Sequence, residues 1–275
     1  MQFLPTAIAL VAALALAPLL LRGLTQAGLV RNNYRDVPLP VPLGVLIVPA
    51  ALIALVPVAL LARLAGVDDI YPDNIGLVML FVPGIALLGL IDDVMSGPGR
   101  GWRGHGASLL TGNLSTGVLK AVGTLGLALL VASGLPGEEG DFLLAAGVLV
   151  LATNVFNLLD LRPGRSIKAF VLLGIGLTAT TTLTDPVADL GIFIAPAIVA
   201  GFFDLREKAM LGDTGSNVIG ALAGLWIVLA CDTDGQLIAL VILFVINVVG
   251  EFTSISALIE KIPGLRHLDS LGRPS

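Results

Sequence analysis

The chain has 275 residues, of which 56% are hydrophobic and 13% charged, and its mean hydropathy is +0.98. A soluble domain rarely has this composition, and repeated apolar runs of about 20 residues indicate a polytopic membrane protein with little room for a soluble domain. The single cysteine, Cys231, excludes an intrachain disulfide and a cysteine-based metal site, and the net charge of −5 conceals a segregation of the two signs.

Taken in chain order, the apolar runs predict nine membrane-spanning helices within a single integral membrane domain, residues 1–275. The expected spans are 3–21, 44–66, 76–92, 115–133, 142–159, 168–183, 187–204, 216–231 and 236–257. The predicted fold class is therefore all-α, a polytopic membrane helical bundle. The first span has no basic residue before it and Arg22 directly after it, which is the reverse of a cleaved signal peptide. We therefore expect an uncleaved span with its N-terminus outside.

The distribution of charges favours this topology. Every Lys and Arg except Arg63 falls in the loops at 22–43, 93–114, 160–167 and 205–215, in the flanking helix ends, or in the tail after residue 257. The opposite loops contain no Lys or Arg but carry Asp68, Asp69, Asp73, Glu138, Glu139, Asp141, Asp185, Asp189, Asp232 and Asp234. Because cytoplasmic loops carry an excess of Lys and Arg, the sequence predicts a cytoplasmic C-terminus.

Polar residues gather at the cytoplasmic ends of three predicted spans. Asn154, Asn157 and Asp160 follow one another at i, i+3 and i+6, so they lie along one drifting stripe of a helix and could face a common cavity. An aspartate at mid-bilayer costs about 3 kcal/mol on insertion scales, and a position at the rim lowers that cost. The three stretches are "LLGLIDDV" with Asp92 and Asp93, "NVFNLLD" with Asn154, Asn157 and Asp160, and "GDTGS" with Asp213.

Each of these features also has a purely structural interpretation. The aspartate pair could be a solvated helix end, and the two asparagines could be interhelical hydrogen-bond partners. The "GDTGS" stretch could simply begin a helix, with Thr214 or Ser216 as its N-cap. The small-xxx-small pattern from Gly220 to Gly224 favours plain helix packing. The occurrence of three polar helix ends on one side of the membrane nevertheless favours a site.

The residue types indicate the chemistry of such a site. Carboxylates suit Mg²⁺, which prefers carboxylates, substrate phosphates and water as ligands. The N-terminus of the eighth span offers free N–H groups and the positive end of a helix dipole to an anion. Arg162, Arg165 and Lys168 add positive charge, and arginine pairs well with phosphate. This pattern predicts a site for a phosphorylated or nucleotide substrate, and the membrane setting suggests a lipid as the other reactant.

Four stretches of the chain, in this order, carry a resemblance to a known family. They are "NYRDVPLPVPLG" after the first span, "IDDV", "NVFNLLD", and "GDTGS" followed by Gly220. In these stretches the chain resembles the polyprenyl-phosphate N-acetylhexosamine-1-phosphate transferases (glycosyltransferase family 4, which includes phospho-N-acetylmuramoyl-pentapeptide transferase). The resemblance covers most of the chain and matches the order and membrane side of the family's motifs.

This resemblance implies a reaction. A membrane polyprenyl phosphate attacks the β-phosphate of a UDP-amino sugar in the presence of Mg²⁺, and UMP is released. Charge neutralisation and in-line positioning would supply the catalysis. The implied setting is cell-envelope glycan synthesis at the bacterial cytoplasmic (inner) membrane, with polyprenyl phosphate, a UDP-sugar and the bilayer as partners. No nucleic acid partner is expected, and a homodimer is compatible with the family.

The resemblance also implies roles for individual residues. Asp213 would be a Mg²⁺ ligand, and Asp92 or Asp93 would deprotonate the lipid phosphate or help to hold the metal. The implied catalytic residues are Asp92, Asp93, Asp160 and Asp213, of which Asp93, Asp160 and Asp213 form the implied metal set. The implied substrate- or phosphate-binding residues are Lys120, Asn154, Asn157, Arg162, Arg165, Lys168, Gly215 and Ser216.

The sequence departs from the family at two places. The family motif is Asn-x-x-Asn-x-x-Asp-Gly-x-Asp-Gly. This chain has Leu161 in place of the first glycine of that motif and Pro163 in place of its second acid. The histidine-rich loop that follows the ninth span in the family, and its further span, have no counterpart here, and His267 is interpreted as a solvated tail histidine.

Three functions therefore stay open at the level of sequence. The first is an active, divergent transferase. The second is a catalytically degenerate member that binds polyprenyl phosphate or a nucleotide sugar as a scaffold or regulator. The third is a small transporter, which would need charged or broken helices near mid-membrane. Few residues meet that requirement beyond Glu251, near the inner end of the last span.

Overall fold

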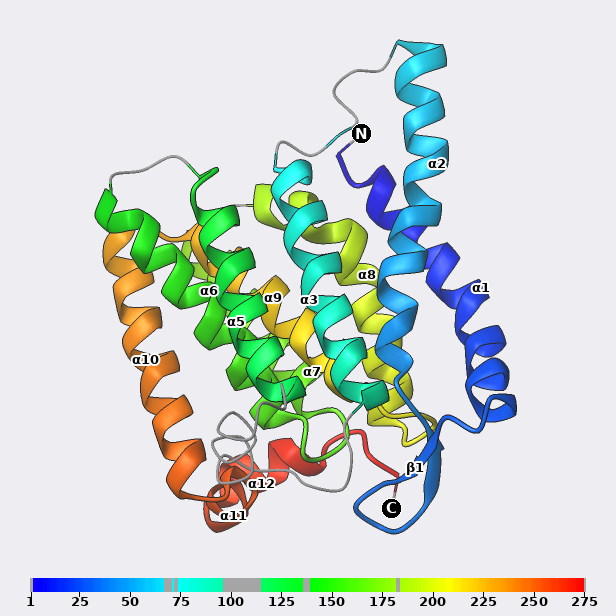
Figure 1. The fold of residues 1–275 in the computed structure, drawn as a ribbon, viewed down its shortest axis with the longest axis vertical. Coiled ribbons are helices and arrows are strands. Elements are labelled where there is room, and N and C mark those ends of the chain that lie inside the picture. Colours follow the sequence, from blue (N-terminus) through cyan, green and yellow to red (C-terminus); the bar gives the residue numbers. More distant parts are fainter. Residues whose placement is uncertain are drawn as a thin grey trace.

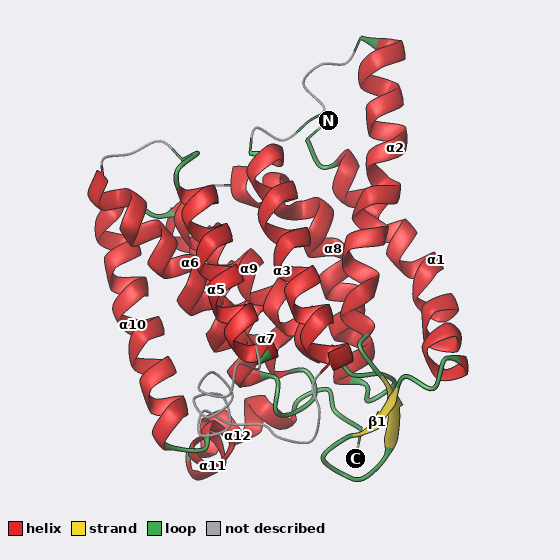
Figure 2. Ribbon diagram, in the orientation of Figure 1, coloured by secondary structure: helices red, strands yellow, loops and turns green. Residues whose placement is uncertain are grey.

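The computed structural model describes residues 2–66, 71, 74–95, 115–135, 139–181 and 184–274, and 81% of these residues are helical. Figure 2 shows the helices with one small two-stranded sheet at an end of the bundle. The elements up to residue 132 are α1 (Leu4–Gln26), β1 (Val30–Asn32), β2 (Pro38–Pro40), the 3-10 helix η1 (Leu43–Leu46), α2 (Ile47–Ala65), α3 (Ile75–Met95) and α5 (Thr116–Ala132). Those that follow are α6 (Glu139–Leu159), α7 (Arg165–Thr181), α8 (Asp185–Leu205), α9 (Gly212–Ala230), α10 (Thr233–Phe252), α11 (Ile255–Lys261) and α12 (Pro263–Ser270).

In the part of the chain that the structure describes, seven helices are long and apolar enough to cross a membrane, which indicates a multi-pass, membrane-embedded architecture. They are α1, η1 continued by α2, α3, α6, α8, α9 and α10. The other two predicted spans, 115–133 and 168–183, also coincide with helices, because α5 and α7 lie there with 17 residues each. The all-α prediction is confirmed for the residues that the structure describes.

Local sequence sets several helix ends. Pro5 lies in the first turn of α1, where its missing N–H costs nothing. Gly66 ends α2 in the left-handed conformation that favours glycine. Ser115 and Asp232 cap α5 and α10 by accepting hydrogen bonds from the backbone N–H groups of residues 118 and 235.

The helix α9 lies at the centre of the bundle and packs against α3, α6, α7 and α8. Of the seven apolar helices it is the most deeply buried, and α10 is the least. A Cβ on Gly220 would lie 2.7 Å from the Cα of Thr153, so the absence of a side chain lets α6 and α9 approach closely. The small-xxx-small pattern from Gly220 to Gly224 therefore serves packing, as predicted.

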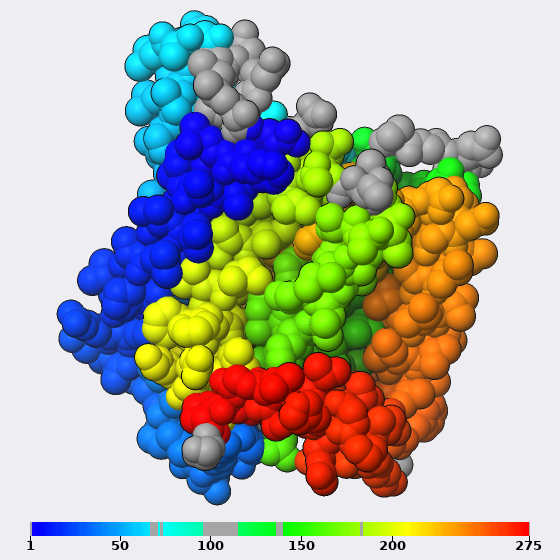
Figure 3. All heavy atoms as spheres, turned by 180° about the vertical axis from the view of Figure 1, so that it is seen from behind, coloured from blue at the N-terminus to red at the C-terminus, as the bar shows by residue number. Residues whose placement is uncertain are grey.

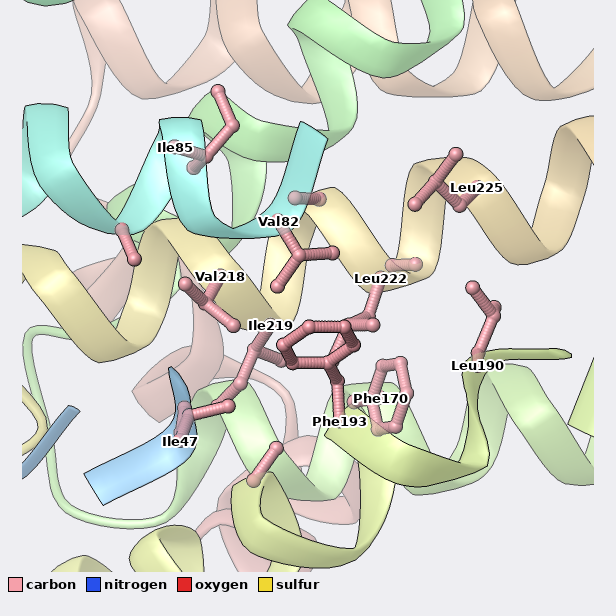
Figure 4. Packing of buried hydrophobic residues seen from close by; sticks show 14 of the residues in the cluster. Ile47, Val82, Ile85, Phe170, Leu190, Phe193, Val218, Ile219, Leu222 and Leu225 are labelled. Carbon is pink, nitrogen blue, oxygen red and sulfur yellow. The ribbon is translucent and has the colours of Figure 1, made fainter. Parts of the chain in front are cut away.

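The apolar core surrounds α9. Figure 4 shows side chains of α9 meeting those of α2, α3, α7 and α8. The rings of Phe170 and Trp226 meet edge to face with centroids 5.7 Å apart, a favourable aromatic geometry. The labelled residues are Ile47, Val82, Ile85, Phe170, Leu190, Phe193, Val218, Ile219, Leu222 and Leu225. This packing fixes the direction in which α9 presents its first turn.

The two ends of the bundle differ. The β1–β2 hairpin, the short helices α11 and α12 and the C-terminus lie at one end, here called the hairpin end, and the N-terminus lies at the other (Figure 1). The C-terminal ends of α3, α6 and α8 and the start of α9 meet at the hairpin end. Expected outer-loop acids Asp68, Asp69, Asp73 and Glu138 lie outside the described residues.

Candidate functional site

Two of the predicted aspartates share one lysine at the hairpin end. Lys120 Nζ lies 3.0 Å from Asp92 Oδ2 and 2.7 Å from Asp213 Oδ2. The three side chains come from α5, α3 and α9, and each keeps between 13% and 23% of its surface exposed. An ammonium and two carboxylates therefore meet at three helix ends, still open to solvent.

Asp93, the neighbour of Asp92, faces the start of α9. Its Oδ1 accepts the backbone N–H of Asp213 at 3.0 Å, and its Oδ2 accepts the N–H and the hydroxyl of Thr214 at 2.8 and 2.7 Å. These N–H groups have no partner within their own helix, because they lie in its first turn. Asp93 is 5% exposed, so a buried carboxylate from α3 caps α9.

This arrangement corrects the predicted N-cap. The structure begins α9 at Gly212, with Leu211 before it, and gives the helix no cap from a side chain of its own. Thr214 and Ser216 therefore lie inside the helix, and the prediction that one of them is the N-cap was wrong. The correction has a simple cause, because the capping carboxylate is 120 residues away in the sequence.

Glycines allow α9 to begin against its neighbours. A Cβ on Gly89 of α3 would lie 2.6 Å from the carbonyl oxygen of Asp213, and a Cβ on Gly44 of η1 would overlap the backbone of Gly215. Gly212 has φ of +71°, which L side chains rarely adopt. Gly215, predicted to bind phosphate, therefore lies with its backbone packed against η1.

The stripe on α6 divides between the site and a neighbouring helix. Ser216 Oγ donates a hydrogen bond to Asn157 Oδ1 at 3.1 Å, so the side chain of Asn157 contacts the N-terminal part of α9. Asn154 instead donates to Asn247 Oδ1 of α10 at 2.5 Å. The structural interpretation as interhelical hydrogen-bond partner therefore holds for Asn154, which lies apart from the carboxylates.

Asp160 follows α6 in the loop 160–164 and lies near the other carboxylates. Its Oδ1 accepts a hydrogen bond from Ser166 Oγ at 3.5 Å. Burial, and then the negative charges of Asp204, Asp213 and Asp93, raise the pKa of Asp160 well above its ordinary value. The negative charges of the neighbouring aspartates therefore act on Asp160.

Asp204, which sequence reasoning missed, holds two loops of the site. Its Oδ2 accepts the backbone N–H of Gly164 at 2.7 Å and its Oδ1 that of Leu211 at 3.3 Å. It is 3% exposed, so these two bonds keep a buried carboxylate satisfied. A signal was present, because Asp204 ends a predicted span at the cytoplasmic side, as Asp92 and Asp160 do.

The three cations after Asp160 have partners elsewhere. Arg162 lies 4.3 Å from the ring centroid of Tyr34 and pairs with Glu260 at 3.4 Å. Arg165 binds Asp269 through two hydrogen bonds of 2.7 and 3.0 Å. Lys168 donates to three backbone carbonyls of residues 268–271. Their phosphate-binding role stays a prediction, and the structure directs Arg165 and Lys168 to the C-terminal segment instead.

The predicted metal set of Asp93, Asp160 and Asp213 is not assembled. Across the described ranges, no group of three or more His, Cys, Asp and Glu side chains is arranged to hold a metal ion. Both carboxylate oxygens of Asp93 accept hydrogen bonds from α9, so this side chain does not fit the role of a metal ligand. Asp92 and Asp213 do fit Mg²⁺, because that ion is usually held by one or two carboxylates together with substrate phosphates.

No family model matches the sequence, and no curated protein matches it either.

Proposed function

We propose that this protein is a membrane phosphoglycosyl transferase. It moves a sugar-1-phosphate, of the N-acetylhexosamine type, from a UDP-sugar to a polyprenyl phosphate for cell-envelope glycan synthesis. One observation carries the proposal: Lys120 lies between the carboxylates of Asp92 and Asp213, beside the capped first turn of α9, at one end of a membrane bundle. A phosphate-binding cation and metal-binding oxygens side by side are what phosphoryl transfer requires.

The proposal includes a topology of nine spans with the hairpin end in the cytoplasm of a bacterium. The helices α5 and α7 would cross as well, since 17 residues give a helix of about 25 Å, near the thickness of the hydrocarbon core. Within the described part of the chain, Arg63 is the one cation at the far end of the bundle. The positive-inside rule then places the hairpin end, and the site, at the cytoplasmic face of the inner membrane.

Each residue of the site has a distinct role in this proposal. The ammonium of Lys120 binds a phosphate oxygen, and Asp92 takes the proton of the lipid phosphate. Asp213 is the residue that would hold Mg²⁺ together with substrate phosphates, and the ion would neutralise charge on the diphosphate. Asp93 positions the first turn of α9 through its three hydrogen bonds, and Asn157 orients Ser216.

A binding-only role is the second candidate. One observation favours it: position 163, where the resembling family has its second acid, is a proline whose carbonyl accepts a hydrogen bond from Arg273 at 2.8 Å. A scaffold that binds polyprenyl phosphate or a nucleotide sugar would keep Lys120 and dispense with that acid.

Release of UMP separates the two candidates. Purified protein is incubated with Mg²⁺, undecaprenyl phosphate and a panel of UDP-sugars. We expect UMP from at least one sugar, and a loss of about 100-fold in Asp213→Asn, since removal of one electrostatic contact at a reacting phosphate costs this much. Asp234→Asn, which changes an exposed aspartate at the far end of the bundle, is the matched control.

The outcomes are distinct. Absence of UMP with every sugar, together with measurable binding of undecaprenyl phosphate, would favour the binding-only role. Full turnover in Asp213→Asn would show that the reaction centre lies elsewhere.

A further inference from the structure

The C-terminal residues 254–274, here called the strap, lie across the hairpin end of the bundle. Figure 3 shows the strap in red, running over the lower ends of α7, α8 and α10. All residues of α12 except Asp269 are exposed, and these include Leu265 and Leu268. No residue of α12 is fully buried, so polar contacts contribute to holding that helix in place.

Asp269 is the centre of those contacts. Its carboxylate lies 2.7 Å from Arg165 Nε and 2.6 Å from Arg273 Nη2, with second bonds of 3.0 and 3.1 Å to the same two guanidinium groups. The side chains of Arg165, Asp269 and Arg273 are 4%, 11% and 10% exposed. Bidentate pairs of this kind, shielded from water, are the strong form of an ion pair.

The strap also binds through its backbone. Lys168 Nζ donates to the carbonyl oxygens of Leu268 and Asp269 at 2.9 and 2.5 Å, at the C-terminal end of α12, where a cation complements the helix dipole. Arg35 Nη2 donates to the carbonyl oxygen of Pro274 at 3.0 Å, which ties the end of the strap to the β1–β2 loop.

One contact reaches the loop of the candidate site. Arg273 Nε donates to the carbonyl oxygen of Pro163 at 2.8 Å, while its two terminal nitrogens bind Asp269. The N–H of the same peptide group, that of Gly164, donates a hydrogen bond to Asp204. The loop 160–164 is thus fixed between a buried carboxylate of α8 and a guanidinium of the strap.

We propose that Asp269 and Arg273 are positioning residues, which hold in place the loop 160–164 and with it Asp160. The strap holds this loop by one hydrogen bond to its backbone, from Arg273 to the carbonyl oxygen of Pro163. The loop is the segment in which Leu161 and Pro163 stand in place of a glycine and an acid of the family motif that the sequence resembles. This inference rests on the proposed function for its catalytic consequence, and on the contacts of the strap for its structural part.

The test compares four variants in the full-length protein. Asp269→Asn and Arg273→Gln remove the charges, Asp269→Glu restores the carboxylate, and Arg266→Gln is the control, because Arg266 is an exposed cation of the same helix. Hydrogen exchange of the amides in residues 158–168 measures the order of the loop without any need for turnover. UMP release measured against UDP-sugar concentration gives kcat and KM.

We expect both charge-removing variants to accelerate exchange in residues 158–168 about tenfold and to lower kcat about tenfold, with KM within about twofold, because a misplaced group slows the chemical step more than binding. Asp269→Glu should recover most of both effects, and Arg266→Gln should show neither. Recovery by the glutamate also excludes simple misfolding of the asparagine variant.

Other results would overturn the inference. Unchanged exchange in Asp269→Asn would show that the strap does not hold the loop, and faster exchange with unchanged kcat would make its role merely structural. If the wild-type protein releases no UMP, the proposed transferase fails, and hydrogen exchange of residues 158–168 alone then decides the structural part of the inference. Unchanged exchange in Asp269→Asn and Arg273→Gln would overturn the positioning role in that case as well.

Discussion

The carboxylate of Asp93, on α3, caps α9 by accepting hydrogen bonds from both the backbone N–H and the hydroxyl of Thr214 at 2.8 and 2.7 Å. Its neighbour Asp92 points to Lys120 instead. Two adjacent aspartates thus have different structural roles, since one caps α9 and the other accepts a hydrogen bond from Lys120.

Replacement of Asp93 should therefore destabilise the protein more than replacement of Asp92. Asp93→Asn removes a charged acceptor from buried donors, and hydrogen bonds to charged groups contribute about 1.5–3 kcal/mol each. We expect a lower midpoint of thermal unfolding in detergent for Asp93→Asn, and a change of about 1 kcal/mol or less for Asp92→Asn, whose carboxylate is partly exposed. Equal midpoints for the two variants would contradict the capping role.

Lys120 should be needed for binding as well as for turnover. Lys120→Met leaves Asp92 and Asp213 facing each other without the ammonium that lies 3.0 and 2.7 Å from them. Like charges repel an approaching phosphate, so we expect a fall of about 100-fold in UMP release and a weaker affinity for UMP by calorimetry. Lys120→Arg keeps the charge and should retain more affinity than Lys120→Met. Unchanged UMP affinity in Lys120→Met would place the phosphate elsewhere.

A methyl group at Gly89 should displace α3 from α9. The added Cβ would lie 2.6 Å from the carbonyl oxygen of Asp213, and backbone cannot yield as a flexible side chain would. Overpacking of this kind costs about 1–3 kcal/mol, so we expect Gly89→Ala to lower both the unfolding midpoint and UMP release. Gly126→Ala in α5, where no atom lies within 4 Å of the new Cβ, should change neither.

The strap should stay docked throughout the physiological pH range. Burial raises the pKa of Asp269, but hydrogen bonds from Arg165 and Arg273 outweigh it and lower that pKa to about 2. Because the pKa in the folded protein is below that of a free carboxyl, about 3.9, the carboxylate stabilises docking fully above pH 4 and loses this effect as the pH falls toward 2.

A spin label at Arg266→Cys, in a Cys231→Ser background, reports this docking through its mobility. We expect constant mobility from pH 8 to pH 5. In Asp269→Asn the label should be more mobile at every pH, and a release of the wild-type strap near pH 6 would contradict the assignment to Asp269.

The sequence was sufficient to predict the helices but only part of the site. Hydrophobic runs of membrane length predicted every helix that the structure describes between residues 4 and 252, because a span must be apolar along its whole length. The topological argument also brought Asp92, Asp213 and Asn157 to one end of the bundle. The details depend on pairs distant in sequence, such as Asn154 with Asn247 and Arg165 with Asp269, which local periodicity does not encode.

The contacts of Lys120 with Asp92 and Asp213 also have a consequence for the order in which the proposed transferase would bind its ligands. Asp92 and Asp213 together carry one negative charge more than the ammonium between them compensates. A diphosphate that arrives alone meets this excess, whereas a divalent cation that arrives first reverses it. In the proposed transferase, these three side chains therefore favour binding of the cation before binding of the nucleotide.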